Sequence, residues 1–157
     1  MRSFTAALAV SLLLAGAAQA QCPAGWGGNG TITSATASAE FGAARLNPGQ
    51  AASVSLHPVS EVRFAAPPQK RGEASSYGGM LELDVREAGT YQVSLSAGAW
   101  IDMLKDGNAV ASTVHGHDAG CSDLRKMVTF PLQPGRYVIQ LSGNKEASIK
   151  LLVSQGR

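Results

Sequence analysis

The sequence is short of the residues from which many functional sites are built. Its 157 residues include three histidines, two cysteines and two tryptophans, and charged residues make up only 15% of the chain. Lysine and arginine outnumber aspartate and glutamate by only 13 to 11, and no segment is strongly basic, so no nucleic-acid partner is expected. Gly-x-Ser-x-Gly, phosphate-loop and Cys-x-x-Cys motifs are absent. Hydrolase, nucleotide-binding and thiol-redox functions therefore lack their usual sequence components.

Long apolar runs are also scarce, and the clearest one lies near the start. Ala6–Leu14 follows the basic Arg2 and precedes Ala18-Gln19-Ala20, which matches the Ala-x-Ala pattern of a signal-peptidase site. The run is too short for a membrane span, which needs about 20 apolar residues. We therefore predict a signal peptide over residues 1–20, no membrane span, and a periplasmic or secreted location.

The remaining length suits one domain with its own hydrophobic core. The segment after the predicted cleavage site is rich in glycine, serine, threonine and alanine, and Trp26 is its largest side chain. We predict an N-terminal arm over residues 21–45 and a β-sandwich domain over residues 46–157.

Cys22 and Cys121 are the two cysteines, and an even pair in an exported chain usually forms a disulfide. The bond would tie the arm to the segment that carries two of the histidines. Lipidation of Cys22 is the alternative, and it requires a small residue just before the cysteine, where Gln21 stands.

Apolar and polar residues alternate with a period of two between glycine and proline breaks, which is typical of short antiparallel strands. Four segments show this most clearly, with apolar positions at Ala52/Val54/Leu56, Leu81/Leu83/Val85, Tyr91/Val93/Leu95 and Tyr137/Ile139/Leu141. Further strands are predicted around residues 62–65, 99–105, 110–114, 126–132 and 147–153. We therefore predict an all-β fold, an antiparallel β-sandwich or jelly roll of about eight strands.

Two segments between the strands are predicted to be turns or loops. Asp106-Gly107-Asn108 favours a tight hairpin turn, because these residues tolerate positive φ. Pro67–Gly72 cannot donate enough backbone hydrogen bonds for a central strand and is predicted as an exposed loop.

The segments Gly89–Ser96 and Gly135–Ser142 echo one another. Each begins with a glycine, places a tyrosine two residues later and then alternates. The echo indicates either an internal repeat or the independent use of residues that suit a half-buried strand.

Trp100 and Asp102 form the first candidate site. Ile101 and Met103 fall on the opposite side of the same predicted strand, so Trp100 would be exposed if those two residues face the core. An exposed indole beside a carboxylate can stack on a sugar ring or a peptide and accept a hydrogen bond from it. The alternative is that Trp100 packs under the arm or against the other sheet.

His115, His117 and Asp118 form the second candidate site, a metal site. Residues two apart on a strand point to the same face, and neutral imidazoles at that spacing can share a metal ion. Cys121 could add a sulfur ligand only if it is reduced. The alternative is a polar, solvated loop.

Four short motifs carry a resemblance to a known family. They are Tyr77-Gly78-Gly79-Met80, Glu87–Tyr91, Ala99–Asp102 and Gln133–Tyr137. Over about residues 46 to 153 the chain resembles small exported bacterial proteins that are similar to pre-peptidase C-terminal β-sandwich modules. That resemblance implies a noncatalytic accessory domain of the kind attached to secreted enzymes, here without an enzyme domain beside it.

The chain also resembles the homogentisate 1,2-dioxygenase family, iron enzymes of the cupin fold. This second resemblance rests on His115-Gly116-His117 and Pro134-Gly135. It implies an iron site with three histidines and a carboxylate. The chain departs from that motif where Ala109 replaces a glycine, Cys121 and Ser122 stand in place of the carboxylate, and Val138 stands in place of the third histidine. His57 is the one other histidine in the chain.

Two functional hypotheses follow. The first is an exported, noncatalytic accessory or binding module without a cofactor, which recognises a glycan, a peptide, an envelope protein or another surface ligand through Trp100 and Asp102. The second is a mononuclear metal protein or dioxygenase-like enzyme that holds one divalent ion, such as iron, zinc or copper, through His115 and His117.

Overall fold

The computed structural model describes residues 22–117 and 120–156. The predicted signal peptide and Asp118 lie outside these residues. Within them, no helix is long and apolar enough to cross a bilayer.

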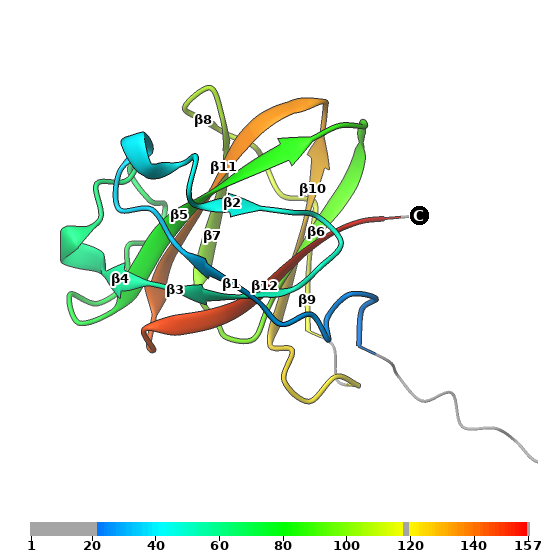
Figure 1. The fold of residues 1–157 in the computed structure, drawn as a ribbon, viewed down its shortest axis with the longest axis horizontal. Helices are drawn as coiled ribbons and strands as arrows, with labels where there is room; N and C mark the ends of the chain where they lie inside the picture. Colours follow the sequence, from blue (N-terminus) through cyan, green and yellow to red (C-terminus); the bar gives the residue numbers. More distant parts are fainter. Residues whose placement is uncertain (1–21, 118–119, 157) are drawn as a thin grey trace, which may run out of the picture.

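The regular secondary structure of the described chain is almost all β-strand (Figure 1). Its strands are β1 (Gly30–Thr33), β2 (Arg45–Leu46), β3 (Ala52–Ser55), β4 (His57–Pro58), β5 (Tyr77–Val85), β6 (Gly89–Leu95), β7 (Trp100–Lys105), β8 (Asn108–Ala109), β9 (Val114–Gly116), β10 (Lys126–Leu132), β11 (Gly135–Asn144) and β12 (Ser148–Gln155). Two single-turn 3₁₀ helices, η1 (Ser38–Glu40) and η2 (Val59–Glu61), interrupt the strands.

The strands form two sheets. Sheet A has the order β1-β3-β12-β6-β10-β9, and sheet B has the order β2-β5-β11-β7-β8 with β4 added beside β5. The predicted all-β sandwich is confirmed, but the described residues contain more strands than expected, and two pairs, β1 with β3 and β2 with β5, are parallel. The strands beyond the predicted set are two to four residues long, too short to show a clear alternation.

The core lies between the sheets and contains every apolar position of the four alternating segments. Val54, Leu81, Val93 and Ile139, one from each segment, are completely buried. At about 25 cal/mol for each Å² of apolar surface removed from water, these side chains supply much of the free energy of folding. The alternation therefore identified the inner faces of both sheets correctly.

Two of the connections between the sheets are tyrosine corners. The Tyr91 hydroxyl donates to the carbonyl of Glu87 at 2.8 Å, where β5 of sheet B leads into β6 of sheet A. The Tyr137 hydroxyl donates to the carbonyl of Gln133 at 2.9 Å, where β10 of sheet A leads into β11 of sheet B. The sequence echo thus corresponds to one structural device used twice, a tyrosine that bonds back to the backbone four residues upstream.

The hairpin predicted at Asp106-Gly107 is confirmed, since Asp106 (φ 51°) and Gly107 (φ 77°) both have positive φ and join β7 to β8. The strand expected at 110–114 is wrong for most of its length, because residues 110–113 cross from the edge of sheet B to β9 of sheet A. The strand expected at 62–65 is also wrong. Val62 follows η2 directly. Its side chain packs in the core, but its backbone belongs to neither sheet.

The segment 66–72 lies along the outer face of sheet B, although most of its side chains are exposed as predicted. Gln140 holds it at one end, accepting from the amide of Ala66 and donating to its carbonyl, both at 3.1 Å. Further along, Ser142 donates to the carbonyl of Lys70 at 2.6 Å. The backbone then approaches so closely that a Cβ on Gly72 (φ 82°) would lie 2.3 Å from Cα of Gly143. This segment, which we call the strap, buries polar side chains that the outer face of a sheet would otherwise expose.

Candidate functional site

A groove opens along the free edge of β7. On one side β7 pairs with β11 along Trp100–Leu104, but on the other it pairs with β8 only at Leu104 and Lys105. The crossing segment 110–113 roofs the gap, and Val110 donates its amide to the carbonyl of Met103 at 2.8 Å. The resulting cavity of about 360 Å³ reaches between the sheets.

The groove has an apolar floor and a polar rim. Its floor consists of core residues of both sheets, Ile101, Met103, Val128 and Phe130. Its rim includes Gln69, Trp100, Ser112, His115 and Lys126. An apolar cavity with a few polar groups at its mouth is the usual form of a small-ligand site.

Trp100 is half-buried at this rim and has a fixed orientation. Its indole N–H donates to Oδ1 of Asp102 at 2.9 Å. Oδ2 of Asp102 accepts from the backbone amide of Gln69 at 3.2 Å. Because Asp102 is only 5% exposed and both of its oxygens already accept hydrogen bonds, it positions the indole and the strap.

Two lysines that the sequence did not single out lie against the same indole. The Nζ of Lys70, on the strap, is 4.7 Å from the ring centroid of Trp100. The Nζ of Lys126, on β10, is 5.1 Å from that centroid and donates to the carbonyl of Ala99 at 2.8 Å. Burial lowers the pKa of Lys126, and the positive charge of Lys70 lowers it further. No sequence spacing links these positions, because the strap and β10 meet at Trp100 only in the folded chain.

His115 lies in this groove too, so the structure brings the two predicted sites together. Its Nε2 is 2.8 Å from Oγ of Ser112 in the crossing segment. His117, just beyond β9, is exposed and its Nδ1 contacts the carbonyl of Arg125. The two histidines therefore have different hydrogen-bond partners.

The described residues do not complete a metal site around His115 and His117. In the part of the chain that the structure describes, the one group of three His, Cys, Asp or Glu residues with ligand atoms within 4.8 Å of one another is Cys22, Cys121 and Asp123. The third histidine, His57, instead places Nε2 3.0 Å from the carbonyl of Ser34. The predicted ligand Asp118 lies outside the described residues, so metal binding by this set stays a prediction.

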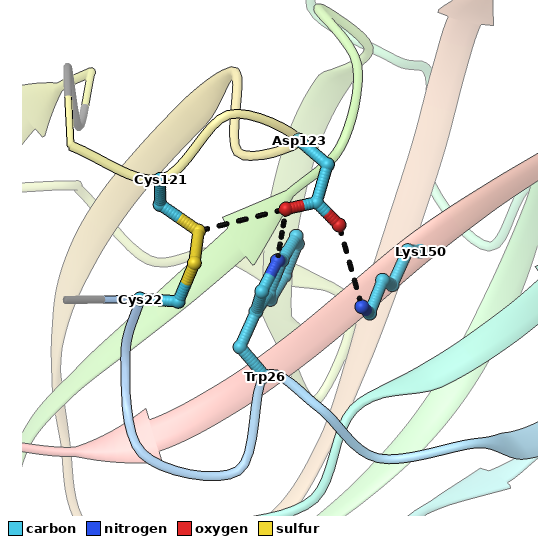
Figure 2. Close-up of a disulfide and its surroundings, with 5 residues drawn as sticks. All are labelled: Cys22, Trp26, Cys121, Asp123 and Lys150. Carbon is cyan, nitrogen blue, oxygen red and sulfur yellow. Dashed lines mark hydrogen bonds and ion pairs between the residues drawn. A yellow bond between two sulfur atoms is a disulfide. The ribbon is translucent and has the colours of Figure 1, made fainter.

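Cys22 and Cys121 form the predicted disulfide. Figure 2 shows that it belongs to a compact cluster at the start of the described chain. The buried Trp26 donates its indole N–H to Oδ1 of Asp123 at 2.9 Å, and Nζ of Lys150 lies 3.4 Å from Oδ2. Sγ of Cys121 contacts Asp123 Oδ1 at 3.6 Å, but a disulfide sulfur carries no hydrogen to donate. The hydrogen bond from Trp26, with help from Lys150, lowers the pKa of Asp123.

This cluster anchors the predicted arm to sheet A. Trp26 is 3% exposed and packs with Ala51, Leu124 and Leu152 in a second, smaller core. Two cysteines and an aspartate at this spacing resemble a metal-binding set, but the disulfide occupies both sulfurs. The cluster therefore serves as an anchor in this state of the protein.

A second charged cluster lies on the outer face of sheet B. Glu82, nearly buried, is 2.6 Å from Arg45 and 3.5 Å from Arg136. Asp84 pairs with the same two arginines at 3.4 and 3.5 Å. Two acids thus balance two bases, which suits an ion-pair network that joins β2, β5 and β11.

The fold places the chain in the class of two-sheet β-sandwich proteins. No protein-family model matches it, and no curated protein sequence does. Among solved structures, it is similar to the pre-peptidase C-terminal domain of a collagenase from Bacillus anthracis, with 12% identity over 69% of this chain and 91% of that domain (TM-score 0.42). It is also similar to a β-glucosidase from Paenibacillus barengoltzii, with 17% identity over 87% of this chain but 12% of that one (TM-score 0.29). At these values neither likeness assigns a function.

Proposed function

We propose that this protein is an exported, noncatalytic binding module that holds a glycan in the groove beside Trp100. The observation that carries the proposal is the half-buried indole, held by Asp102 at the mouth of an apolar cavity. An indole in this position presents apolar surface to a sugar ring while neighbouring polar groups reach its hydroxyls.

Export is supported by the disulfide. Disulfides form and persist in oxidising compartments and are rare in reducing ones. The Cys22–Cys121 bond and the predicted signal peptide therefore point to the same location, the periplasm or the outside of the cell.

The proposal of a noncatalytic role rests on how the groove's acid and base are engaged. Asp102 has both oxygens committed to Trp100 and Gln69, and His115 is paired with Ser112. A general acid or base must reach the proton it transfers, and a second carboxylate for glycoside hydrolysis is missing from the groove lining within the described residues.

The test is a panel of soluble oligosaccharides, with binding measured by calorimetry and tryptophan fluorescence. We expect at least one member to bind, and Trp100→Ala to abolish that binding. Trp100→Phe keeps an aromatic ring and leaves Trp26 as the sole tryptophan, so it should retain weakened binding in calorimetry while the fluorescence change disappears. A fluorescence change that survives in Trp100→Phe would place the ligand elsewhere.

Product analysis tests the noncatalytic part of the proposal. Bound oligosaccharides should be recovered intact after long incubation. Shortened chains or new reducing ends, absent from a Trp100→Ala control, would contradict it.

A further inference from the structure

Two lysines lie against the indole at the mouth of the groove, and no ion pair among the described residues neutralises either of them: Lys126 lines the groove, and Lys70 lies beside it. Lys70 and Lys126 place their ammonium groups 4.7 and 5.1 Å from the centre of one indole. Every ion pair among the described residues is made by Arg45, Arg136 or Lys150, so neither of these two lysines has a carboxylate partner there.

Asp102, which contacts the same indole, does not fill that role. Asp102 gives its two oxygens to the indole of Trp100 and the amide of Gln69. By contrast, Glu82 and Asp84 pair with two arginines across the outer face of sheet B.

Holding two ammonium groups together is unfavourable unless an anion joins them. Lys126 is partly desolvated and feels the charge of Lys70, and both effects lower its pKa. A ligand carboxylate between the two lysines would form charge-assisted hydrogen bonds and remove their mutual repulsion.

The remaining rim groups favour a sugar as the carrier of that anion. Ser112 and His115 offer hydrogen-bonding atoms, which suit hydroxyl groups, and Trp100 offers a flat apolar surface. A cavity of about 360 Å³ with an apolar floor is large enough for a sugar ring.

We infer that the groove recognises an acidic oligosaccharide, with a uronate carboxylate held between Lys70 and Lys126 and its ring against Trp100. This inference rests on the proposed function and narrows its ligand class. The recognition uses no covalent step.

The test compares two ligands with the same sugar backbone, an oligomer of galacturonic acid, which is charged, and its methyl ester, which is neutral. We expect the acid to bind at least about tenfold more tightly, because charge-assisted hydrogen bonds are roughly twice as strong as neutral ones. Raising the sodium chloride concentration should weaken binding of the acid and leave binding of the ester unchanged.

The lysines are tested by Lys70→Met and Lys126→Met, with Lys145→Met as the control. Lys145 is an exposed lysine in the β11–β12 turn and lies outside the groove. Each of the Lys70 and Lys126 variants should lower the affinity for the acid to about the affinity for the ester. The Lys145→Met control should bind the acid as tightly as the wild type. Near-UV circular dichroism verifies folding, and Lys126→Gln replaces Lys126→Met if the latter is misfolded.

The outcomes separate the inference from the proposed function. If the ester binds as tightly as the acid, the inference is wrong and the glycan-binding proposal stands. If a glutamate oligomer of equal charge binds as tightly as the galacturonate, the site recognises negative charge alone. The inference that its ligand is a sugar is then wrong. If no acidic or neutral oligosaccharide binds, both proposals fail.

Discussion

Two tyrosine hydroxyls hold the chain where it leaves one sheet for the other. Tyr91 and Tyr137 are 3% and 2% exposed, and each donates to the carbonyl four residues earlier. The Tyr137 oxygen also accepts from the amide of Gln133 at 3.0 Å, so it satisfies two backbone groups. A buried carbonyl without its donor is costly, which makes these hydroxyls important for stability.

Removing each hydroxyl should therefore destabilise the fold. We expect Tyr91→Phe and Tyr137→Phe to lower the free energy of unfolding by about 1 to 3 kcal/mol, with the larger loss at Tyr137 because the amide of Gln133 also loses its acceptor. Urea denaturation measures both values. Tyr77→Phe is the matched control, since its hydroxyl makes no hydrogen bond with the described residues, and an equal loss there would contradict the assignment.

Tyr91 also makes stability depend on alkaline pH. Burial raises the pKa of its phenol, and the negative charge of Glu87 raises it further. The folded state then holds the phenolic proton more tightly than the unfolded chain. The resulting contribution to stability is complete below the ordinary pKa of about 10 and is lost as pH rises through the raised value.

We therefore expect the free energy of unfolding to fall above about pH 10, and to fall less steeply in Tyr91→Phe. Urea titrations at several pH values measure the two slopes. Equal slopes would mean that this phenol ionises alike in the folded and unfolded chain.

At the scale of elements, two segments without long strands are held against the sheets. The strap lies along the outer face of sheet B and brings Lys70 against the indole of Trp100. The start of the described chain is held by the disulfide, by the Trp26–Asp123 hydrogen bond and by packing against Leu152. Both segments depend on contacts with residues far away in the sequence.

Removing the disulfide should loosen the N-terminal segment before it affects the sheets. We expect Cys22→Ser/Cys121→Ser to lower the free energy of unfolding by at most about 4 to 5 kcal/mol, the chain-entropy value for so long a loop. In a Trp100→Phe background, acrylamide should quench Trp26 more strongly in the double variant than in the disulfide-bonded protein. Unchanged quenching would show that Asp123 and the smaller core hold Trp26 without the bond.

At the scale of the whole molecule, the two sheets share one hydrophobic core. The tyrosine corners and the crossing segment 110–113 connect the sheets covalently, and the larger core contains residues of both. The smaller core is joined to sheet A because it includes Leu152 of β12, a strand of that sheet.

We expect a single unfolding transition under oxidising conditions. Trp26 fluorescence in Trp100→Phe and far-UV circular dichroism of the same protein should give coincident urea curves, because coincidence of independent probes is a test of two-state behaviour. An earlier change in the Trp26 signal would mean that the smaller core unfolds on its own.

The sequence predicted the sheets' inner faces and the disulfide, because both follow from local patterns. Period-two alternation marks buried positions such as Leu83 and Val93. With two cysteines in the sequence, only one intramolecular disulfide can form. The short strands β1, β2 and β4 were missed, since two to four residues carry too little pattern.

The candidate site was predicted only in part, for a similar reason. Trp100, Asp102 and His115 were singled out and lie at one groove, but Lys70 and Lys126 were not. Their role depends on where the strap lies, and the strap is placed by Gln140 and Ser142, polar residues that look solvent-exposed in an alternating strand.

The position of β12 sets an order of events for a chain made from its N-terminus. β12 is the last strand in the sequence, yet it lies between β3 and β6 inside sheet A (Figure 1). Until its residues have been synthesised, β3 and β6 have no shared neighbour and sheet A remains in two parts. Sheet A must therefore stay incompletely folded until β12 has been synthesised, a state compatible with transport as an extended chain.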